Sequence, residues 1–434
     1  MSVAELAPPA PGPASQVLVP AEGRIVSLQR VRGMGLFLLA LAGVTAGFFG
    51  AGVGANEKST FLLTAPPAPS VAPLVMPVQP VCFALAGACA LFGAALLLRR
   101  RAQGSYLIFG LGVVVFLWAF LTWVAKGSQL NFVQMLAETL VFTTPLLYGS
   151  LSGIMCERSG VVNIAIEGQF LAGAFLGAMI GSATGVLWLG ALAGAVAGAL
   201  FGALLAFLAL RYGADQIIVG VVIVAFCTGL TNFLTETVLT PYQSTLNSPS
   251  TFSPVGIPGL DKIPVLGPVL FYQNVFFYGS VILLVVVHVA LFKTRWGLRA
   301  RAVSEHPRAA ETVGIHVLSV RYRNVVLGGV IAGIGGASFT IGSIGEFSAG
   351  MTAGLGYVAL AAMIFGRWRP FGALGAALLF GFSESVESFL ALFNVGIPSP
   401  FLAMAPYIMT IAVVSGLVGR VRPPAADGVP YSRE

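Results

Sequence analysis

Long apolar runs, separated by short polar stretches, make up most of this 434-residue chain. A run of about 20 mostly apolar residues is long enough to cross the hydrocarbon core of a bilayer as a helix. The pattern therefore predicts an all-α polytopic membrane protein with about twelve transmembrane segments. The predicted segments are 34–54, 78–98, 105–125, 132–155, 168–182, 187–210, 216–236, 274–292, 324–344, 353–366, 371–392 and 401–419.

Two of these runs, 168–182 and 353–366, are too short to cross the bilayer as regular helices. A glycine-broken polar stretch precedes each one, G-V-V-N-I-A-I-E-G before the first and G-M-T-A-G-L-G-Y before the second. Such breaks are tolerated only where protein or a water-filled cavity satisfies the free backbone groups. Each short run is followed by a span rich in glycine and alanine, and the two pairs run in opposite directions. The pattern predicts an inverted repeat, which in transporters places the substrate path between the halves.

Glycine recurs every four residues in two neighbouring runs, at Gly173, Gly177, Gly181 and Gly185, and at Gly190, Gly194, Gly198 and Gly202. On a helix this spacing forms a flat strip that another backbone can approach closely. We interpret the strips as sites of tight packing within the bundle, and a moving interface is the alternative.

The distribution of basic residues predicts the orientation of the chain. If the N-terminus is inside, twenty of the 23 Lys and Arg face the cytoplasm, and three face outward: Lys58, Lys126 and Lys262. Cytoplasmic loops carry such an excess of basic residues. Hydrophobic residues make up 57% of the chain and charged residues 9%, against about 25% in soluble domains. The net charge of +7 follows this sidedness, so it does not indicate a nucleic-acid partner.

The terminal segments and two loops are polar or rich in proline. Residues 1–33 are rich in Pro and Ala and then basic, which predicts a disordered cytoplasmic N-terminus without a signal peptide. Residues 423–434 are expected to form a cytoplasmic tail. Residues 55–77 are expected to form an extended outer loop. The long outer segment 237–273 is a candidate docking surface for an external partner.

The segment 293–323 is a polar, basic island between two apolar runs. It holds seven of the 23 Lys and Arg, opposed only by Glu305 and Glu311. Pro307 suits the first turn of a helix, and Gly314 suits its C-terminal cap. The pattern predicts a short amphipathic helix across the cytoplasmic face, to which a partner could dock. A solvated basic loop attracted to anionic membrane lipid is the alternative interpretation.

No enzyme signature is present. The phosphate-binding motif G-x-x-x-x-G-K-[ST] does not occur, and none of the four lysines follows a glycine. The three histidines lack metal-ligand spacing, and the four cysteines lie in or beside apolar runs, where an inert thiol is expected. We therefore expect no catalytic residue, no metal and no cofactor on this chain.

Two segments carry a resemblance to a known family. T-R-W-G-L-R-A-R-A-V-S-E-H-P-R-A-A-E-T-V-G-I resembles the coupling loop of ABC importer permeases of the branched-chain amino acid, simple sugar and nucleoside class. P-L-L-Y-G-S-L-S-G-I-M-C-E-R-S-G-V-V-N-I-A-I-E-G-Q-F-L-A-G-A-F resembles the broken-helix signature of the same class. Within this segment, the stretch E-R-S-G-V-V-N-I-A-I-E-G is most similar to nucleoside (guanosine-type) permeases. The likeness indicates a permease core over 128–422, preceded by an extra module of three transmembrane helices over 34–127.

The resemblance implies an importer in a bacterial cell membrane, built from several chains. Its parts are two related permeases as a heterodimer, a cytoplasmic ABC ATPase that binds ATP and Mg²⁺, and an extracytoplasmic binding lipoprotein. Nucleotide-driven closure of the ATPase would tilt the helices and alternate access to a path between the permeases. The residues implied in ATPase coupling are Trp296, Gly297, Leu298, Arg299, Arg301, Glu305, Pro307, Ala309, Ala310 and Gly314.

Polar groups inside a membrane are functional candidates by default. The candidates for the substrate path are Asn163, Glu167, Gln169, Glu346, Phe347, Tyr357 and Glu384. For Glu167 the alternative is a structural role, as a cap of its helix or a partner of Arg158. The aromatic rings of Phe347 and Tyr357 could stack on a nucleoside base or could simply pack in the bundle.

The sequence thus favours the permease subunit of an ATP-driven importer, with nucleosides as the first choice of substrate. A simple sugar or a branched-chain amino acid is the alternative within the same role. A secondary transporter or channel that works alone is the alternative from another class. The intramembrane carboxyl of Glu384 favours that class, and the segment 293–314 argues against it.

Overall fold

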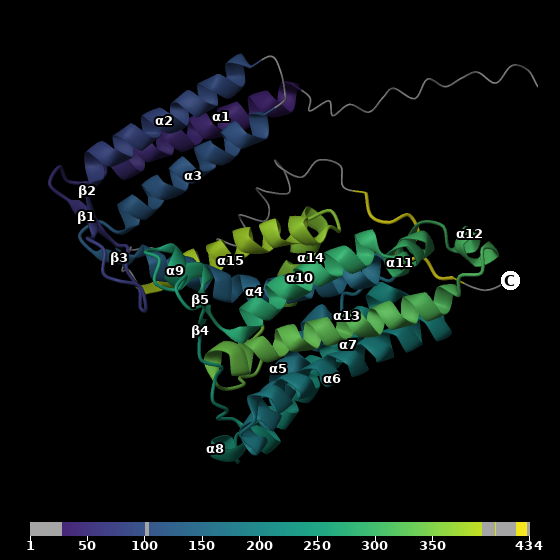
Figure 1. Ribbon diagram of the computed structural model, residues 1–434. Helices are drawn as coiled ribbons and strands as arrows, with labels where there is room; N and C mark the ends of the chain where they lie inside the picture. Colours follow the sequence, from purple (N-terminus) through teal and green to yellow (C-terminus); the bar gives the residue numbers. More distant parts are fainter. Residues whose placement is uncertain (1–27, 100–103, 393–403, 405–421, 432–434) are drawn as a thin grey trace, which may run out of the picture. The chain divides into compact units, whose positions relative to one another are not determined.

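The computed structural model describes residues 28–99, 104–392, 404 and 422–431 (Figure 1). The predicted disordered segment 1–33 falls mostly outside these ranges, as does the predicted span 401–419 apart from Met404. Within the described ranges, ten helices are long and apolar enough to cross a membrane. The chain divides into two compact units, which are described separately. The protein is therefore a helical, multi-pass membrane protein, as the hydrophobic pattern predicts.

The first unit is a bundle of three helices. It consists of α1 (Leu28–Val44), the π-helical turn η1 (Thr45–Gly50), and most of α2 (Val78–Leu98) and α3 (Ser105–Val124). The buried thiol of Cys89 on α2 donates to the carbonyls of Leu38 on α1, at 3.5 Å, and Gly112 on α3, at 3.8 Å. Three helices therefore enclose this cysteine.

Two small sheets lie in the second unit. In the first, β1 (Lys58–Leu62) pairs antiparallel with β2 (Leu74–Pro77) and parallel with β3 (Gln129–Asn131). The segment 55–77, predicted as an extended loop, thus contains a hairpin, because its backbone groups find strand partners. In the second sheet, β4 (Val255–Gly256) pairs antiparallel with β5 (Tyr272–Gln273) within the long segment 237–273.

The remaining elements of the second unit are helical. The long helices are α4 (Phe132–Glu157), α5 (Ile166–Thr184), α6 (Leu187–Ala206), α7 (Gln216–Leu234), α10 (Val275–Lys293), α13 (Val317–Phe339) and α15 (Pro370–Leu392). The shorter helices are α8 (Gln243–Leu246), α9 (Leu266–Leu270), α11 (Arg295–Glu305), α12 (Pro307–Thr312) and α14 (Leu355–Phe365). The π-helical turns η2 (Phe207–Arg211), η3 (Thr235–Leu239) and η4 (Thr340–Ile344) extend α6, α7 and α13.

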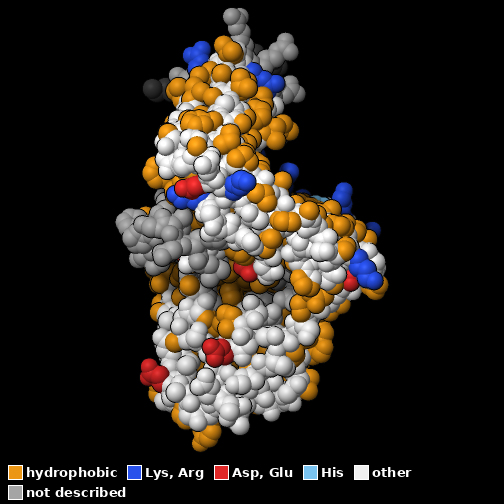
Figure 2. Space-filling view, turned by 90° about the vertical axis from the view of Figure 1, so that its left-hand side faces the viewer, with side chains coloured by type: hydrophobic (Ala, Val, Ile, Leu, Met, Phe, Trp, Pro, Cys, Tyr) orange, Lys and Arg blue, Asp and Glu red, His pale blue; other side chains and the backbone are white. Residues whose placement is uncertain are grey.

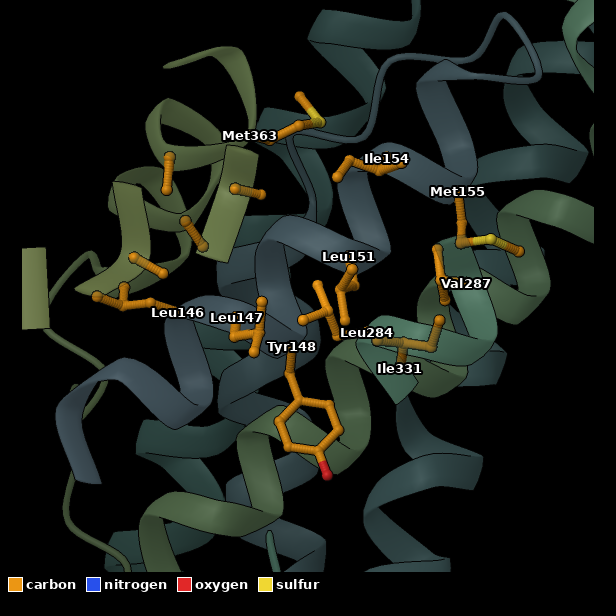
Figure 3. Close-up of a cluster of buried hydrophobic side chains, with 14 of the residues drawn as sticks. Leu146, Leu147, Tyr148, Leu151, Ile154, Met155, Leu284, Val287, Ile331 and Met363 are labelled. Atoms are coloured by element: carbon orange, nitrogen blue, oxygen red, sulfur yellow. The ribbon is translucent and has the colours of Figure 1, made fainter. Parts of the chain in front are cut away.

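Helix α4 is the central helix of this unit. It packs against α10, α13, α14 and α15, and 89% of its most apolar window is buried. Figure 3 shows part of the cluster of buried side chains around it, to which α4, α10, α11, α13, α14 and α15 contribute. The labelled members are Leu146, Leu147, Tyr148, Leu151, Ile154, Met155, Leu284, Val287, Ile331 and Met363. Between membrane helices the stabilisation comes from such van der Waals packing, because lipid tails are as apolar as leucine.

The glycine strips of α5 and α6 pack against α13. A Cβ atom at Gly198 would lie 2.1 Å from the carbonyl oxygen of Gly329, and one at Gly173 would lie 2.3 Å from that of Gly333. Only glycine permits such close backbones, so the tight-packing interpretation is confirmed for these positions. Gly185 differs, because it ends α5 in a left-handed conformation at φ 67°.

The two predicted short runs differ in the structure. Helix α14 has 11 residues, as expected, but α5 has 19 and is a full candidate span, so the prediction that 168–182 cannot cross is wrong. The helix begins earlier than hydropathy suggests, at Ile166, and includes Glu167. A hydropathy scale counts a charged carboxyl against membrane insertion, so the predicted run starts after Glu167. In the structure this carboxyl accepts hydrogen bonds from groups at the start of α14.

Candidate functional site

The predicted coupling segment forms two helices that follow α10 directly. Thr294 is the N-cap of α11, and its Oγ1 accepts a hydrogen bond from the backbone N–H of Gly297 at 3.2 Å. A Cβ atom at Gly297 would lie 2.2 Å from the carbonyl oxygen of Ala290, so only glycine allows α11 to fold against the end of α10. The direction of α11 is therefore set by this contact.

Helix α11 is amphipathic. Its buried face includes Ala300 and Val303, whereas Leu298 is 61% exposed and Arg299 is exposed. The guanidinium of Arg301 lies 5.3 Å from the ring centroid of Phe292, at the end of α10. Trp296 is partly buried against the core of the second unit. One face of α11 thus holds the helix to the bundle, and the other is free to meet a partner.

Helix α12 completes the element. It begins at Pro307 and ends at Thr312, and Gly314 follows in the left-handed region at φ 83°. The N–H of Gly314 donates to the carbonyl of Glu311 at 2.8 Å, as a C-terminal cap would. Ala310 is buried beside Val303, while Ala309 and Glu305 are exposed. The predicted short helix from Pro307 to its cap at Gly314 corresponds to α12, whereas α11 before it is an additional helix that was not predicted.

The end of α4 holds the turn between α14 and α15. The indole Nε1 of Trp368 donates to Glu157 Oε2 at 2.5 Å. Arg158 donates from Nε to the carbonyl of Trp368 at 3.1 Å and from a terminal nitrogen to that of Arg367 at 3.4 Å. Burial lowers the pKa of the Arg158 guanidinium. Arg367 and Trp368 have φ angles of 56° and 53°, a strained conformation that persists only when its surroundings fix it.

Glu167 joins the first broken region to the second. Its carboxylate accepts hydrogen bonds from Thr352 Oγ1 at 2.6 Å, from Gly354 N at 2.9 Å and from Gly356 N at 2.7 Å. These groups lie at the N-terminus of α14, so Glu167 caps that helix. A structural role as a helix cap was the alternative interpretation, and the hydrogen bonds place this cap on α14.

Asn163 and Gln169 form a buried polar pair. Asn163 Nδ2 donates to Gln169 Oε1 at 3.1 Å and to Ser152 Oγ at 3.4 Å, and both amides are fully buried. Asn163 Oδ1 and Gln169 Nε2 have no hydrogen-bond partner in the described part of the chain. The pair lies in the protein interior and not on an exposed lining.

The other path candidates are dispersed. Phe347 is 2% exposed and packs edge-on against Phe175 at 5.3 Å, so its ring serves packing. Tyr357 is 45% exposed on α14, and Glu346 is exposed before it. Glu384 is half-buried on α15. Figure 2 shows a hollow in the second unit with hydrophobic side chains inside it and acidic side chains nearby.

Sequence reasoning missed the C-terminal segment and Arg321. Residues 423–431, predicted as part of a cytoplasmic tail, contact the α11–α12 element: the N–H of Ala426 donates to the carbonyl of Ser304 at 2.8 Å. Arg321 is fully buried and donates to the carbonyl of Val429 at 2.9 Å. Because α13 begins at Val317 and not at 324, Arg321 lies within its span. A charge at that position was the available signal.

The described ranges hold no group of three or more His, Cys, Asp or Glu that could bind a metal ion. The four cysteines are free and buried.

Comparison with known proteins gives one family match. Residues 135–416 match the profile of a family described as branched-chain amino acid transport system, permease component. This range begins within α4, so the long helices of the first unit precede it. No solved structure matches the chain.

Several curated proteins are similar to the chain. The guanosine ABC transporter permease protein NupQ of Bacillus subtilis (strain 168) is 41% identical over 307 residues, 68% of this chain and 94% of the relative. The nucleoside ABC transporter permease protein NupC of Lactococcus lactis subsp. cremoris (strain MG1363) is 38% identical over 312 residues, 68% of this chain and 95% of the relative. The putative glucose ABC transporter permease protein TsgC13 of Haloferax volcanii is 32% identical over 323 residues, 69% of this chain and 98% of the relative.

Proposed function

The chain belongs to the family of branched-chain amino acid transport system permease components, and on this basis we propose that it is the membrane-spanning permease of an ATP-driven nucleoside importer. As a permease subunit it is a transport component and not an enzyme. ATP and Mg²⁺ bind to a separate ATPase chain, which hydrolyses the nucleotide. Two relatives named for guanosine or nucleosides, each covered over more than nine-tenths of its length, support the choice of substrate.

The α11–α12 element is the single observation that carries the mechanism. It is polar and basic, its inner face is packed on the bundle, and its outer face presents Leu298 at 61% exposure. A solvent-facing leucine between arginines suits a groove on a partner protein, because buried apolar anchors supply most of the binding energy of an interface. The partner we propose is the cytoplasmic ABC ATPase, whose closure moves α11 and, through the contact at Gly297, the end of α10.

The arrangement of the halves supports an inverted repeat with a path between them. The cap that Glu167 places on α14 couples the first broken region to the second. Ten candidate spans, the short helix α14 and the apolar run 401–419 together agree with about twelve membrane segments. In this scheme the substrate passes near α14 and α15, where Tyr357 and Glu384 have exposed surface.

The orientation and the partners follow from the same scheme. The basic α11–α12 element and both termini lie on the cytoplasmic side of the cell membrane, in accord with the positive-inside rule. The long segment 237–273 then lies outside, where it receives a binding lipoprotein that delivers the nucleoside. A second, related permease completes the path. The three helices of the first unit form an added module.

Replacement of Leu298 tests the coupling role. Leu298→Glu places a charge on the exposed face without touching the packed one. A buried apolar anchor contributes about 2 kcal/mol or more to the binding free energy of an interface, so its loss would weaken docking by about 30-fold or more. Nucleoside uptake and substrate-stimulated ATP hydrolysis by the reconstituted complex should fall accordingly. Ser319→Glu, at an exposed position outside the element, is the matched control. Normal uptake by the Leu298 variant would overturn the docking role.

A sugar is the second candidate substrate, because the glucose permease relative is covered over 98% of its length. Titration of the cognate binding lipoprotein with guanosine and with glucose separates the two. Tight binding of glucose without binding of guanosine would replace the first choice. Uptake into vesicles that contain only this chain, without ATPase or nucleotide, would instead favour a stand-alone transporter.

A further inference from the structure

The C-terminal segment 422–431, here called the strap, contacts both the α11–α12 element and the helices behind it. We propose that the strap is a mechanical link that transmits movement of α11 and α12 to α4 and α13, with Arg321 and Tyr431 as positioning residues. This inference rests on the proposed coupling function of the α11–α12 element. It goes further by assigning a role to a segment that lies beyond the family match, which ends at residue 416.

Three contacts hold the strap to the α11–α12 element. The N–H of Ala426 donates to the carbonyl of Ser304 at 2.8 Å, and the N–H of Ala425 donates to Glu305 Oε2 at 3.3 Å. The hydroxyl of Tyr431 donates to the carboxylate of Glu311, on α12. The strap thus touches the C-terminal end of α11 and the end of α12, so it runs along the second half of the element.

Arg321 holds the strap to α13. Its side chain is fully buried, and it donates to the carbonyls of Val429 at 2.9 Å and Ala426 at 3.3 Å. An apolar side chain would fill the same space without the free-energy cost of burying a charge. The guanidinium of Arg321 therefore serves its hydrogen bonds and not the packing. The contacts of Arg321 therefore point to the strap as the reason for a charge at this position.

The end of α4 provides a second attachment. The carboxyl of Asp427 lies close enough to that of Glu157 for the two to interact, and Glu157 also accepts a hydrogen bond from Trp368 before α15. Gly160 leaves room for the strap, because a Cβ atom there would lie 2.8 Å from Arg321 and 3.2 Å from the carbonyl oxygen of Ala426. Gly160 also has a left-handed φ of 85°, so the backbone conformation and the closeness of the strap both favour glycine at this position.

These contacts give the α11–α12 element a second connection to the bundle. The first is covalent, through the end of α10 and the start of α13. The strap adds a path from Ser304 through Ala426 and Asp427 to Glu157, and so to the turn before α15. Helix α11 packs on α10 and α13, which both pack on α4, and the strap adds a direct connection from the end of α11 to the end of α4.

Two measurements on the reconstituted importer test the link. The first is the rate at which a maleimide labels Ala426→Cys, which reports detachment of the strap, since the four native cysteines are buried. The second is the number of nucleoside molecules taken up per ATP hydrolysed. Arg321→Met removes both bonds to the strap and should raise the detached population, and with it the labelling rate, on the order of 5- to 30-fold. Uptake per ATP should fall while hydrolysis continues.

Two further variants and one control complete the experiment. Arg321→Lys keeps a charged donor and should recover part of the uptake per ATP. Tyr431→Phe loses only the hydroxyl at the outer end of the strap, so it serves as the test if the methionine variant does not fold. Val429→Ala keeps the carbonyl that Arg321 binds, at an exposed position, and should behave like the wild type.

The outcomes separate this inference from the proposed function. Faster labelling with unchanged uptake per ATP would show that the strap is only a packed tail, and unchanged labelling would show that Arg321 does not hold it. Either result overturns the link and leaves the docking role of α11 intact. Normal uptake by Leu298→Glu would remove the docking role itself, whatever the strap variants do.

Discussion

Glu167 Oε2 accepts a hydrogen bond from the backbone N–H of Gly356 at 2.7 Å, although 189 positions separate the two residues. The other carboxylate oxygen binds Thr352 and Gly354, so one side chain satisfies three donors before and within the first turn of α14. A helix N-terminus carries unpaired N–H groups and a partial positive charge. The carboxylate on α5 therefore stabilises the start of a short helix in the other half of the core.

Replacement of Glu167 by Gln should destabilise the protein. The amide keeps one acceptor but loses the charge, and its NH₂ group faces backbone N–H donors that it cannot bind. Hydrogen bonds to charged groups contribute about 1.5–3 kcal/mol, so a loss in this range is expected. Thermal unfolding of the purified protein measures it. Glu236→Gln, at an exposed carboxyl, is the control. An unchanged midpoint for Glu167→Gln would contradict the capping role.

Gly198→Ala should disrupt the contact between α6 and α13. The added methyl group would lie 2.1 Å from the carbonyl oxygen of Gly329, so the helices must separate. Overpacking of this kind destabilises proteins by about 1–3 kcal/mol. The matched control is Gly229→Ala on α7, where a Cβ atom meets nothing within 4 Å. The yield of folded protein and its unfolding midpoint compare the two, and equal values would show that the close approach is unimportant.

Asn247 should anchor the segment that precedes α14. Its side chain donates to the carbonyl of Phe347 at 2.9 Å and accepts from the N–H of the same residue at 2.7 Å. In Asn247→Ala both backbone groups lose their partner, at a cost of about 1–3 kcal/mol for each buried group left unsatisfied. Hydrogen exchange of residues 345–351 should accelerate, whereas Ser253→Ala, at an exposed position, should leave it unchanged. Protection that survives in the Asn247 variant would show that other contacts hold this segment.

The strap should respond to pH through Asp427. Burial raises the pKa of Asp427 from 3.8 to about 6, although a hydrogen bond with Glu157 and the charges of Arg321 and Arg158 oppose the shift. Cys156, Glu157 and Arg158 at the end of α4 and Arg321 of α13 are the titratable groups that face it. The folded state then binds the proton more tightly than the unfolded state. Its contribution to stability is complete below the unfolded pKa and is lost as pH rises through about 6.

Asp427→Asn should abolish this contribution to the pH dependence. The unfolding midpoint, measured between pH 5 and pH 8, should change less with pH in the variant than in the wild type. Asp215→Asn keeps a capping side chain at an exposed position and is the control. Identical pH profiles for Asp427→Asn and the wild type would rule out this carboxyl as the responsible group.

Much of the α11–α12 element could be predicted from its residues. Pro307 and Gly314 act locally, since the first fixes φ at the start of a turn and the second accepts a left-handed φ at its end. Helix α11, which precedes His306, was not predicted. The packing of α11 against α10 was also not predicted, because the close contact at Gly297 depends on where Ala290 lies.

The path candidates show the opposite case. Polarity and aromatic character identified Asn163, Glu167 and Phe347 as worth attention but could not identify their partners, which are Gln169, the start of α14 and Phe175. Each partner except Gln169 is more than a hundred positions away. No local pattern encodes such a pairing.

The sequence by itself determined that this chain is a multi-pass helical membrane protein and a transport permease. The free energy of transfer of a segment into lipid is a sum over the residues of that segment. Apolar runs therefore reveal the spans without reference to the rest of the chain. Only the tertiary structure decided that Glu167 caps α14, that Glu157 and Arg158 hold the turn before α15, and that Arg321 binds the strap. Those contacts require polar groups from distant segments to meet in a low-dielectric interior, where each must find a partner and the fold alone selects which one.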